Sequence, residues 1–136
     1  MEKAVEHLVK LWHIKADNDL LTAENEFKAE QTVTDAICFH SQQAAEKYLK
    51  SYLVAVQKPY KYTHNIAEIL SNCILLDGDF KMLEYALKLT TYSVEIRYPD
   101  DFYIPDMEEA MQAYEIALKV KNFVIKKIGV LRDNSA

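Results

Sequence analysis

The chain contains very little glycine and proline. Of its 136 residues, 2 are Gly and 3 are Pro, well below the usual share of these two residues. Because tight turns depend on both, their scarcity disfavours a loop-rich or all-β architecture. The length fits one domain, which is large enough to bury a core without metals or disulfides.

Cysteine is scarce as well. Cys38 and Cys73 stand alone within helical patterns, without C-x-x-C spacing or a disulfide framework. We expect both to be small, buried, hydrophobic side chains in a reducing compartment.

Motifs that hold metals or phosphates are missing from the sequence. Its histidines are His7, His13, His40 and His64. They show neither the H-x-x-x-H nor the H-E-x-x-H spacing of a metal site. A glycine-rich phosphate loop is also missing, which excludes a P-loop or Rossmann cradle. We therefore predict neither a metal nor a cofactor.

The chain carries no excess of positive charge. Its net charge is -5, which argues against a broad electrostatic footprint for duplex nucleic acid, although a local basic patch stays compatible with it. Met1 leads directly into charged amphipathic sequence without a signal peptide, and the apolar runs are too short to span a membrane. We expect a cytoplasmic protein that does not associate with a membrane.

Apolar residues recur every three or four positions, which predicts helices almost throughout. The expected helices span residues 2–28, 33–57, 64–73, 80–96 and 107–128. Thr63 and Asp106 are the expected N-caps of the third and fifth helices, and Gly129 is the expected stop. Long helices joined by short loops predict an all-α, antiparallel, up-and-down bundle of about five helices, four long and one short. This domain would cover residues 1–130, with 131–136 as a flexible tail.

Two helices carry patterns that bear on packing. In the second helix, the expected solvent face consists of Asp35, Gln42, Glu46 and Lys50. The fourth helix has two apolar stripes, of which one domain core usually covers only one. One stripe is Leu83, Leu87, Thr90 and Val94, and the other is Met82, Tyr85, Leu89, Tyr92 and Ile96. We therefore predict that the uncovered stripe, or the junction near Arg97, lies in a homodimer interface.

The junction between the last two long helices concentrates polar chemistry. Residues 97–103 read Arg-Tyr-Pro-Asp-Asp-Phe-Tyr, and Pro105 follows. A guanidinium, two carboxylates and two phenols in one short loop can make a ligand site. They can equally make an ion pair that fixes the junction.

Four segments in order along the chain carry a family pattern. The segments are Trp12 with Asp17, Asp19, Leu20 and Ala23; residues 39–50 (FHSQQAAEKYLK); Thr63-His64 with Ile66, Ile69 and Leu70; and Arg97-Tyr98-Pro99-Asp100 followed by Glu108-Glu109-Ala110. Together they resemble the HEPN domain family (higher eukaryotes and prokaryotes nucleotide-binding domain). The resemblance extends over nearly the whole chain.

The resemblance implies a helical bundle that dimerises and often pairs with a minimal nucleotidyltransferase. It also implies a likeness to the substrate-binding bundle of antibiotic nucleotidyltransferases. Some members are metal-independent RNases or toxins in which Arg is followed four to six residues later by His. Here Arg97 stands at the corresponding place, but Tyr103 lies within the spacing where that histidine would be. Because an ordinary tyrosine has a pKa near 10, it transfers protons poorly at neutral pH. We expect no catalytic residue in this chain.

The candidate ligand-binding residues are Arg97, Tyr98, Asp100, Tyr103, His40, Lys47 and His64. Each has a structural alternative. Arg97 can form an ion pair with a neighbouring acid, and Tyr98 and Tyr103 can pack the loop onto the bundle. His40 and Lys47 lie two turns apart on one side of a helix and can face a shared cleft, but His40 can also be a core histidine.

Three functions agree with the sequence. The first is a non-catalytic module that binds a nucleotide or RNA and partners a minimal nucleotidyltransferase. The second is a metal-independent RNase toxin of a toxin–antitoxin pair, with Tyr103 or His40 replacing the missing histidine. The third is an assembly module without a ligand.

Overall fold

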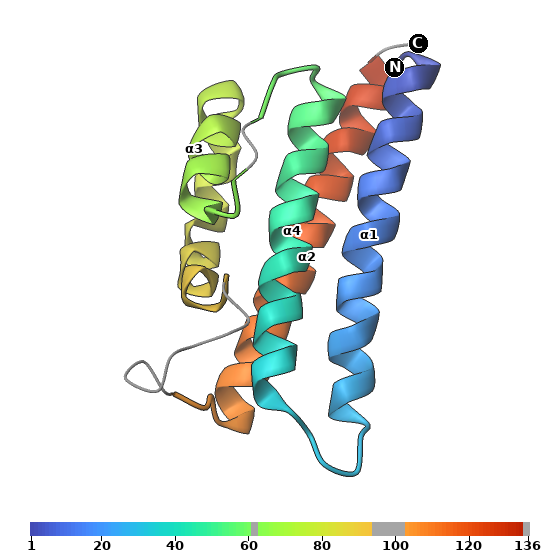
Figure 1. The fold of residues 1–136 in the computed structure, drawn as a ribbon. Coiled ribbons are helices and arrows are strands. Elements are labelled where there is room, and N and C mark those ends of the chain that lie inside the picture. Colours follow the sequence, from blue (N-terminus) through green and yellow to red (C-terminus); the bar gives the residue numbers. More distant parts are fainter. Residues whose placement is uncertain (61–62, 94–102, 135–136) are drawn as a thin grey trace.

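A computed structural model describes residues 1–60, 63–93 and 103–134. Within these ranges the chain forms helices and no strand. The elements are α1 (Lys3–Phe27), α2 (Thr34–Ala55), α3 (Ile66–Leu76), the 3₁₀ helix η1 (Gly78–Tyr92) and α4 (Met107–Asn134). The predicted all-α bundle is confirmed, with α1 running opposite to α2 and α4 (Figure 1).

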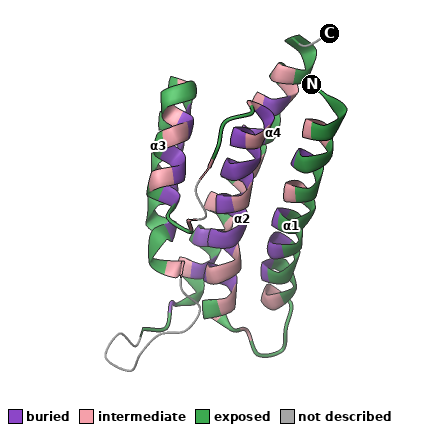
Figure 2. Ribbon diagram, turned by 45° about the horizontal axis from the view of Figure 1, so that its top comes forward, coloured by how far each residue is buried: buried purple, intermediate pink, exposed green. Residues whose placement is uncertain are grey.

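Helix α2 is the centre of the bundle. It packs against α1, α4, α3 and η1, whereas α1 and α4 meet through side chains such as Phe27 and Tyr114, whose ring centroids lie 5.6 Å apart. Figure 1 shows α1 on one side of α2 and α3 with η1 on the other. Most residues of α2 are therefore buried, including six polar ones (Figure 2). The predicted solvent face is right for Asp35, which is exposed, but wrong for Gln42, Glu46 and Lys50, which the neighbouring elements bury.

Short-range contacts set most helix ends. Asp106 caps α4 as predicted, since its Oδ1 accepts from the Glu109 amide at 2.8 Å. Asn65, not Thr63, caps α3, because its side chain accepts from the amide of Glu68. Gln57 lies two residues beyond the end of α2 and has φ 57°. The amide of the next residue, Lys58, donates to the Leu53 carbonyl at 2.9 Å. This is a left-handed C-terminal cap.

The C-terminal half of α4 runs further than expected. It passes through Gly129 and ends at Asn134, so the predicted stop at Gly129 is wrong. Arg132 lies within this last stretch and its Nε donates to Glu6 Oε1 at 2.8 Å. This contact with α1 stabilises the last turns of α4, where the sequence alone predicts the end of the helix.

The segment predicted as a fourth α-helix is a 3₁₀ helix of 15 residues. Its buried residues are Phe80, Leu83, Ala86 and Leu89, which recur every three positions, as a helix with three residues per turn requires. Phe80 anchors it, with its ring centroid 4.4 Å from Tyr52 of α2 and 5.0 Å from Phe123 of α4. Within the described residues the two predicted stripes are wrong, because both assumed the α-helical period; their last members, Val94 and Ile96, lie outside the described residues.

Candidate functional site

The predicted site residues that the structure describes lie in three separate places. Arg97, Tyr98 and Asp100 lie outside the described residues. Tyr103 precedes α4 and contacts Glu109. His40 and Lys47 belong to α2 and contact α1. His64 precedes α3 and contacts Glu46.

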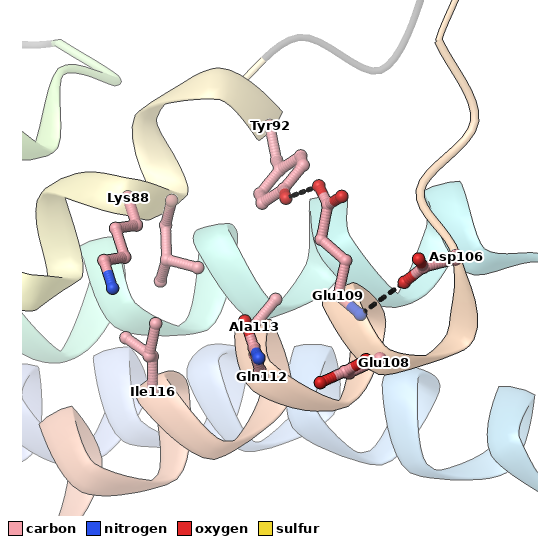
Figure 3. A pocket seen from close by; sticks show the side chains of 9 residues that line it. Lys88, Tyr92, Asp106, Glu108, Glu109, Gln112, Ala113 and Ile116 are labelled. Carbon is pink, nitrogen blue, oxygen red and sulfur yellow. Dashed lines mark hydrogen bonds between the residues drawn. The ribbon is translucent and has the colours of Figure 1, made fainter.

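A pocket of about 370 Å³ lies between η1 and the start of α4 (Figure 3). Its lining residues are Lys88, Leu89, Tyr92, Asp106, Glu108, Glu109, Gln112, Ala113 and Ile116. Three of them carry carboxylates, one carries an ammonium group, and Leu89, Ala113 and Ile116 supply apolar surface. In the sequence, the undescribed residues 94–102 connect the two elements that form this pocket.

Glu109 holds two phenols at the edge of this pocket. The hydroxyl groups of Tyr92 and Tyr103 both donate to its carboxylate, and Figure 3 shows the Tyr92 ring directed at it. Burial raises the pKa of Tyr92, and the hydrogen bond to Glu109 adds to the rise. The hydrogen bond that Tyr103 itself donates to Glu109 raises the pKa of Tyr103 to about 12. Tyr103 therefore stays protonated at neutral pH and donates a hydrogen bond instead of carrying a proton.

His40 and Lys47 share one partner, a carboxylate of α1. The Nδ1 atom of His40 lies 2.8 Å from Asp19 Oδ1, and the ammonium group of Lys47 pairs with Asp19 Oδ2. Asp19 is 8% exposed, so both partners reach into the α1–α2 contact. Both side chains thus point to one carboxylate in a helix contact, and a role for them in binding a ligand stays a prediction.

His64 belongs to a second polar group, centred on Glu46. Its Nδ1 lies 3.1 Å from both carboxylate oxygens of Glu46, and Lys50 Nζ lies 3.3 Å from Oε2. Glu46 is 1% exposed and Lys50 5%, whereas the His64 side chain remains largely exposed. The Gln42 amide donates to both Glu46 Oε1 and the His64 carbonyl at 3.4 Å.

Aromatic rings enclose the cationic side of this group. Lys50 Nζ lies 5.6 Å from the ring centroid of Trp12 and 5.9 Å from that of Tyr60, within the range of a cation–π interaction. A buried ion pair with aromatic neighbours holds α1, α2 and the start of α3 in one arrangement. Sequence reasoning missed this group because it placed Glu46 and Lys50 in solvent; their i, i+4 spacing beside Trp12 and Tyr60 was the available signal.

The two cysteines are buried, as predicted. Burial raises the pKa of each thiol to about 12, so both are protonated at neutral pH. Tyr92 and Glu109 also influence the pKa of Cys38, so the three residues lie near one another. His40 comes two residues later, about 200° around the helix, and contacts α1 instead.

The described ranges, residues 1–60, 63–93 and 103–134, lack two further features. They contain no group of three or more His, Cys, Asp or Glu residues arranged to hold a metal ion. In the same ranges, no helix combines the length and apolar character needed to cross a membrane.

A helical bundle with a polar pocket where the last helix begins agrees with the family suggested by the sequence. Residues 9–128 match the HEPN domain, and the chain belongs to that family. Neither a curated protein nor a solved structure matches the chain significantly.

Proposed function

We propose that this chain is a non-catalytic HEPN module that binds a nucleotide or RNA and partners a minimal nucleotidyltransferase. The bond between Tyr103 and Glu109 carries the non-catalytic part of the proposal. Tyr103 occupies the spacing from Arg97 at which catalytic relatives have a histidine. A phenol with a pKa of about 12 holds its proton at neutral pH, so Tyr103 is a poor substitute for the histidine as general base in an RNA cleavage.

The ligand orientation follows from charge. Asp106, Glu108 and Glu109 repel a phosphate from the pocket wall, whereas carboxylates accept hydrogen bonds from the exocyclic amino groups of bases. We assign the phosphate to Arg97, whose guanidinium offers several donors, and the base to the pocket. Lys88 adds a second cation at the pocket.

The RNase alternative needs a histidine close to the pocket. Of the four histidines, His40 was the sequence candidate for this role, but its ring contacts Asp19 on the α1 side of α2. Cys38, on the opposite side of α2, lies near Tyr92 and Glu109. The pocket and the His40–Asp19 pair therefore lie on different sides of the central helix, which disfavours joint action on one phosphate.

Nucleotide binding is tested with purified protein. Equilibrium binding of fluorescent ATP, GTP and a short single-stranded RNA is measured for wild type, Arg97→Ala and the control Lys126→Ala, at low and high salt. We expect modest affinity that weakens with salt and falls at least fivefold in Arg97→Ala only. An unchanged affinity in Arg97→Ala, together with a lower melting temperature, would instead assign Arg97 to a structural ion pair.

The remaining functions are tested separately. RNA incubated with the protein in EDTA should stay intact, and cleavage that is lost in Arg97→Ala would establish the RNase. Co-purification from the native host should recover a minimal nucleotidyltransferase. A homodimer is part of the proposal and is measured by sedimentation; a dimer that binds no nucleotide and no nucleotidyltransferase would favour the assembly module.

A further inference from the structure

Helix α1 uses all of its acidic side chains within the chain. Its carboxylates are Glu6, Asp17, Asp19, Glu24 and Glu26. Their partners are Arg132 for Glu6, Lys121 and Tyr48 for Asp17, His40 and Lys47 for Asp19, Lys28 for Glu24, and the Val33 amide for Glu26. Each carboxylate of α1 therefore has a partner within the chain.

The lysines of α1, unlike its acids, have no ion-pair partner among the described residues. Lys3, Lys10 and Lys15 are all exposed, and none of them takes part in an ion pair with another described residue. Because the acids are engaged elsewhere, these cations are left facing solvent in a protein whose net charge is -5.

Four large apolar side chains lie among these lysines. Leu8, Leu11, Ile14 and Leu21 are 44–53% exposed. The buried side of α1 carries Val9, Ala16, Leu20 and Ala23, so the exposed set lies on the opposite side of the helix by its 3.6-residue period. Figure 2 shows exposed residues along the outer side of α1. From Leu8 to Leu21 this face extends over about 20 Å.

The four apolar residues with Lys3, Lys10 and Lys15 are called the outer face of α1. One carboxylate borders this face: Asp17 lies one turn after Ile14 and one turn before Leu21, and Lys121 pairs with it at 3.0 Å. An apolar ridge beside unpaired lysines is complementary to a helix whose apolar stripe is bordered by Asp or Glu.

We propose that the outer face of α1 binds an acidic amphipathic helix of a partner protein. This proposal rests on the partner role proposed above and adds the surface and the chemistry of the partner. Contact would bury Leu8, Leu11, Ile14 and Leu21, and the partner's carboxylates would pair with the lysines.

Charge disfavours the other occupants. If α1 packed on α1 of a second copy, its lysines would meet lysines and carboxylates that already have partners in their own chain, such as Glu6 with Arg132 and Asp17 with Lys121. An anionic membrane would attract three lysines by about 1 kcal/mol each, but it would repel the net charge of -5. RNA would pair with the lysines but would leave the leucine ridge largely uncovered.

The test uses two synthetic 21-residue helical peptides with identical leucine stripes. One has Glu at the flanking positions and the other has Lys. Binding is measured by fluorescence anisotropy for wild type, for Lys10→Glu/Lys15→Glu, and for the control Lys81→Glu/Lys126→Glu, which reverses two exposed lysines outside α1. Vesicles with anionic lipid and a single-stranded RNA are titrated in parallel.

We expect wild type and the control to prefer the Glu peptide at least tenfold, and Lys10→Glu/Lys15→Glu to prefer the Lys peptide. Leu11→Ser should weaken both interactions. Equal binding of the two peptides, or a preference that Lys10→Glu/Lys15→Glu does not change, would overturn the proposal. Binding of vesicles or RNA through Lys10 and Lys15 in place of the peptide would overturn it too, and would assign the face to that ligand.

The same variants separate this proposal from the proposed function. Lys10→Glu/Lys15→Glu should retain nucleotide binding, and Arg97→Ala should retain peptide binding. Loss of the nucleotidyltransferase from co-purification with Lys10→Glu/Lys15→Glu, but not with the control, would identify it as the occupant. If wild type recovers no nucleotidyltransferase yet still prefers the Glu peptide, the nucleotidyltransferase is rejected as the partner. The outer face of α1 is then still supported as a binding surface for an acidic helix.

Discussion

The Tyr103 hydroxyl donates a hydrogen bond to Glu109, six residues further along the chain. Tyr92 donates to the same carboxylate from η1. One side chain of α4 thus connects the end of η1 with the residues that precede α4, on either side of the segment that holds Arg97. The protonated phenol at position 103 is the reason to expect binding without hydrolysis.

Replacing Tyr103 with histidine tests this explanation directly. Tyr103→His places an imidazole at the spacing from Arg97 that catalytic relatives use, and its ordinary pKa near 6.5 suits proton transfer at neutral pH. We expect cleavage of RNA in EDTA to rise by about 10²-fold over wild type. Tyr103→Phe is the control, because it removes the bond to Glu109 without adding a proton carrier. A folded Tyr103→His protein without activity would show that more than the missing histidine prevents catalysis.

The Glu46–Lys50 pair should behave as a buried ion pair. Removing one partner leaves the other charge without compensation, so Glu46→Gln and Lys50→Met should each lower the free energy of unfolding by about 3 kcal/mol. The double variant should recover much of this loss. Urea denaturation measures all three, and additive losses in the double variant would argue against coupling between the two charges.

The contact between η1 and α4 predicts a pH dependence. Lys127 Nζ lies 2.8 Å from Asp77 and 2.6 Å from Asp79. The hydrogen bond with Lys127 lowers the pKa of Asp77, and that with Asp77 raises the pKa of Lys127. A lowered carboxyl pKa stabilises the fold above the unfolded value near 3.9 and loses this effect as the pH falls through the folded value. A raised lysine pKa stabilises it below about 10 and loses this effect at higher pH.

Lys127→Met should therefore cost up to about 1 kcal/mol between roughly pH 5 and 9, because the pair is partly exposed. The difference from wild type should shrink below about pH 4 and at strongly alkaline pH. Lys126→Met changes the neighbouring exposed lysine and serves as the control. A cost that is the same at pH 3 and pH 7 would mean that Lys127 acts through packing and not through charge.

Sequence reasoning succeeded where local interactions decide the outcome. Asp106 caps α4 through an amide three residues away, which a short stretch of sequence can specify. The burial of the polar side chains of α2 could not be predicted in this way, because it depends on contacts with α1 and with the residues before α3. The last turns of α4 are stabilised by the hydrogen bond from Arg132 to Glu6, which lies 126 positions away in the sequence. A local pattern contains no information about such a contact.

The 3₁₀ helix η1 offers the sharpest test of the fold, because two of its leucines distinguish the two helix types. Leu83 and Leu87 are one turn apart in an α-helix and would share a face, but in η1 Leu83 is 1% exposed and Leu87 is 41% exposed. Leu83→Ala should lower the free energy of unfolding by about 2–5 kcal/mol through lost contacts and a cavity. Leu87→Ala should cost under about 1 kcal/mol in the isolated chain. Similar large losses at both positions would indicate an α-helical register. If the proposed homodimer uses the exposed side of η1, Leu87→Ala should weaken dimerisation in sedimentation experiments while leaving the stability of the monomer nearly unchanged.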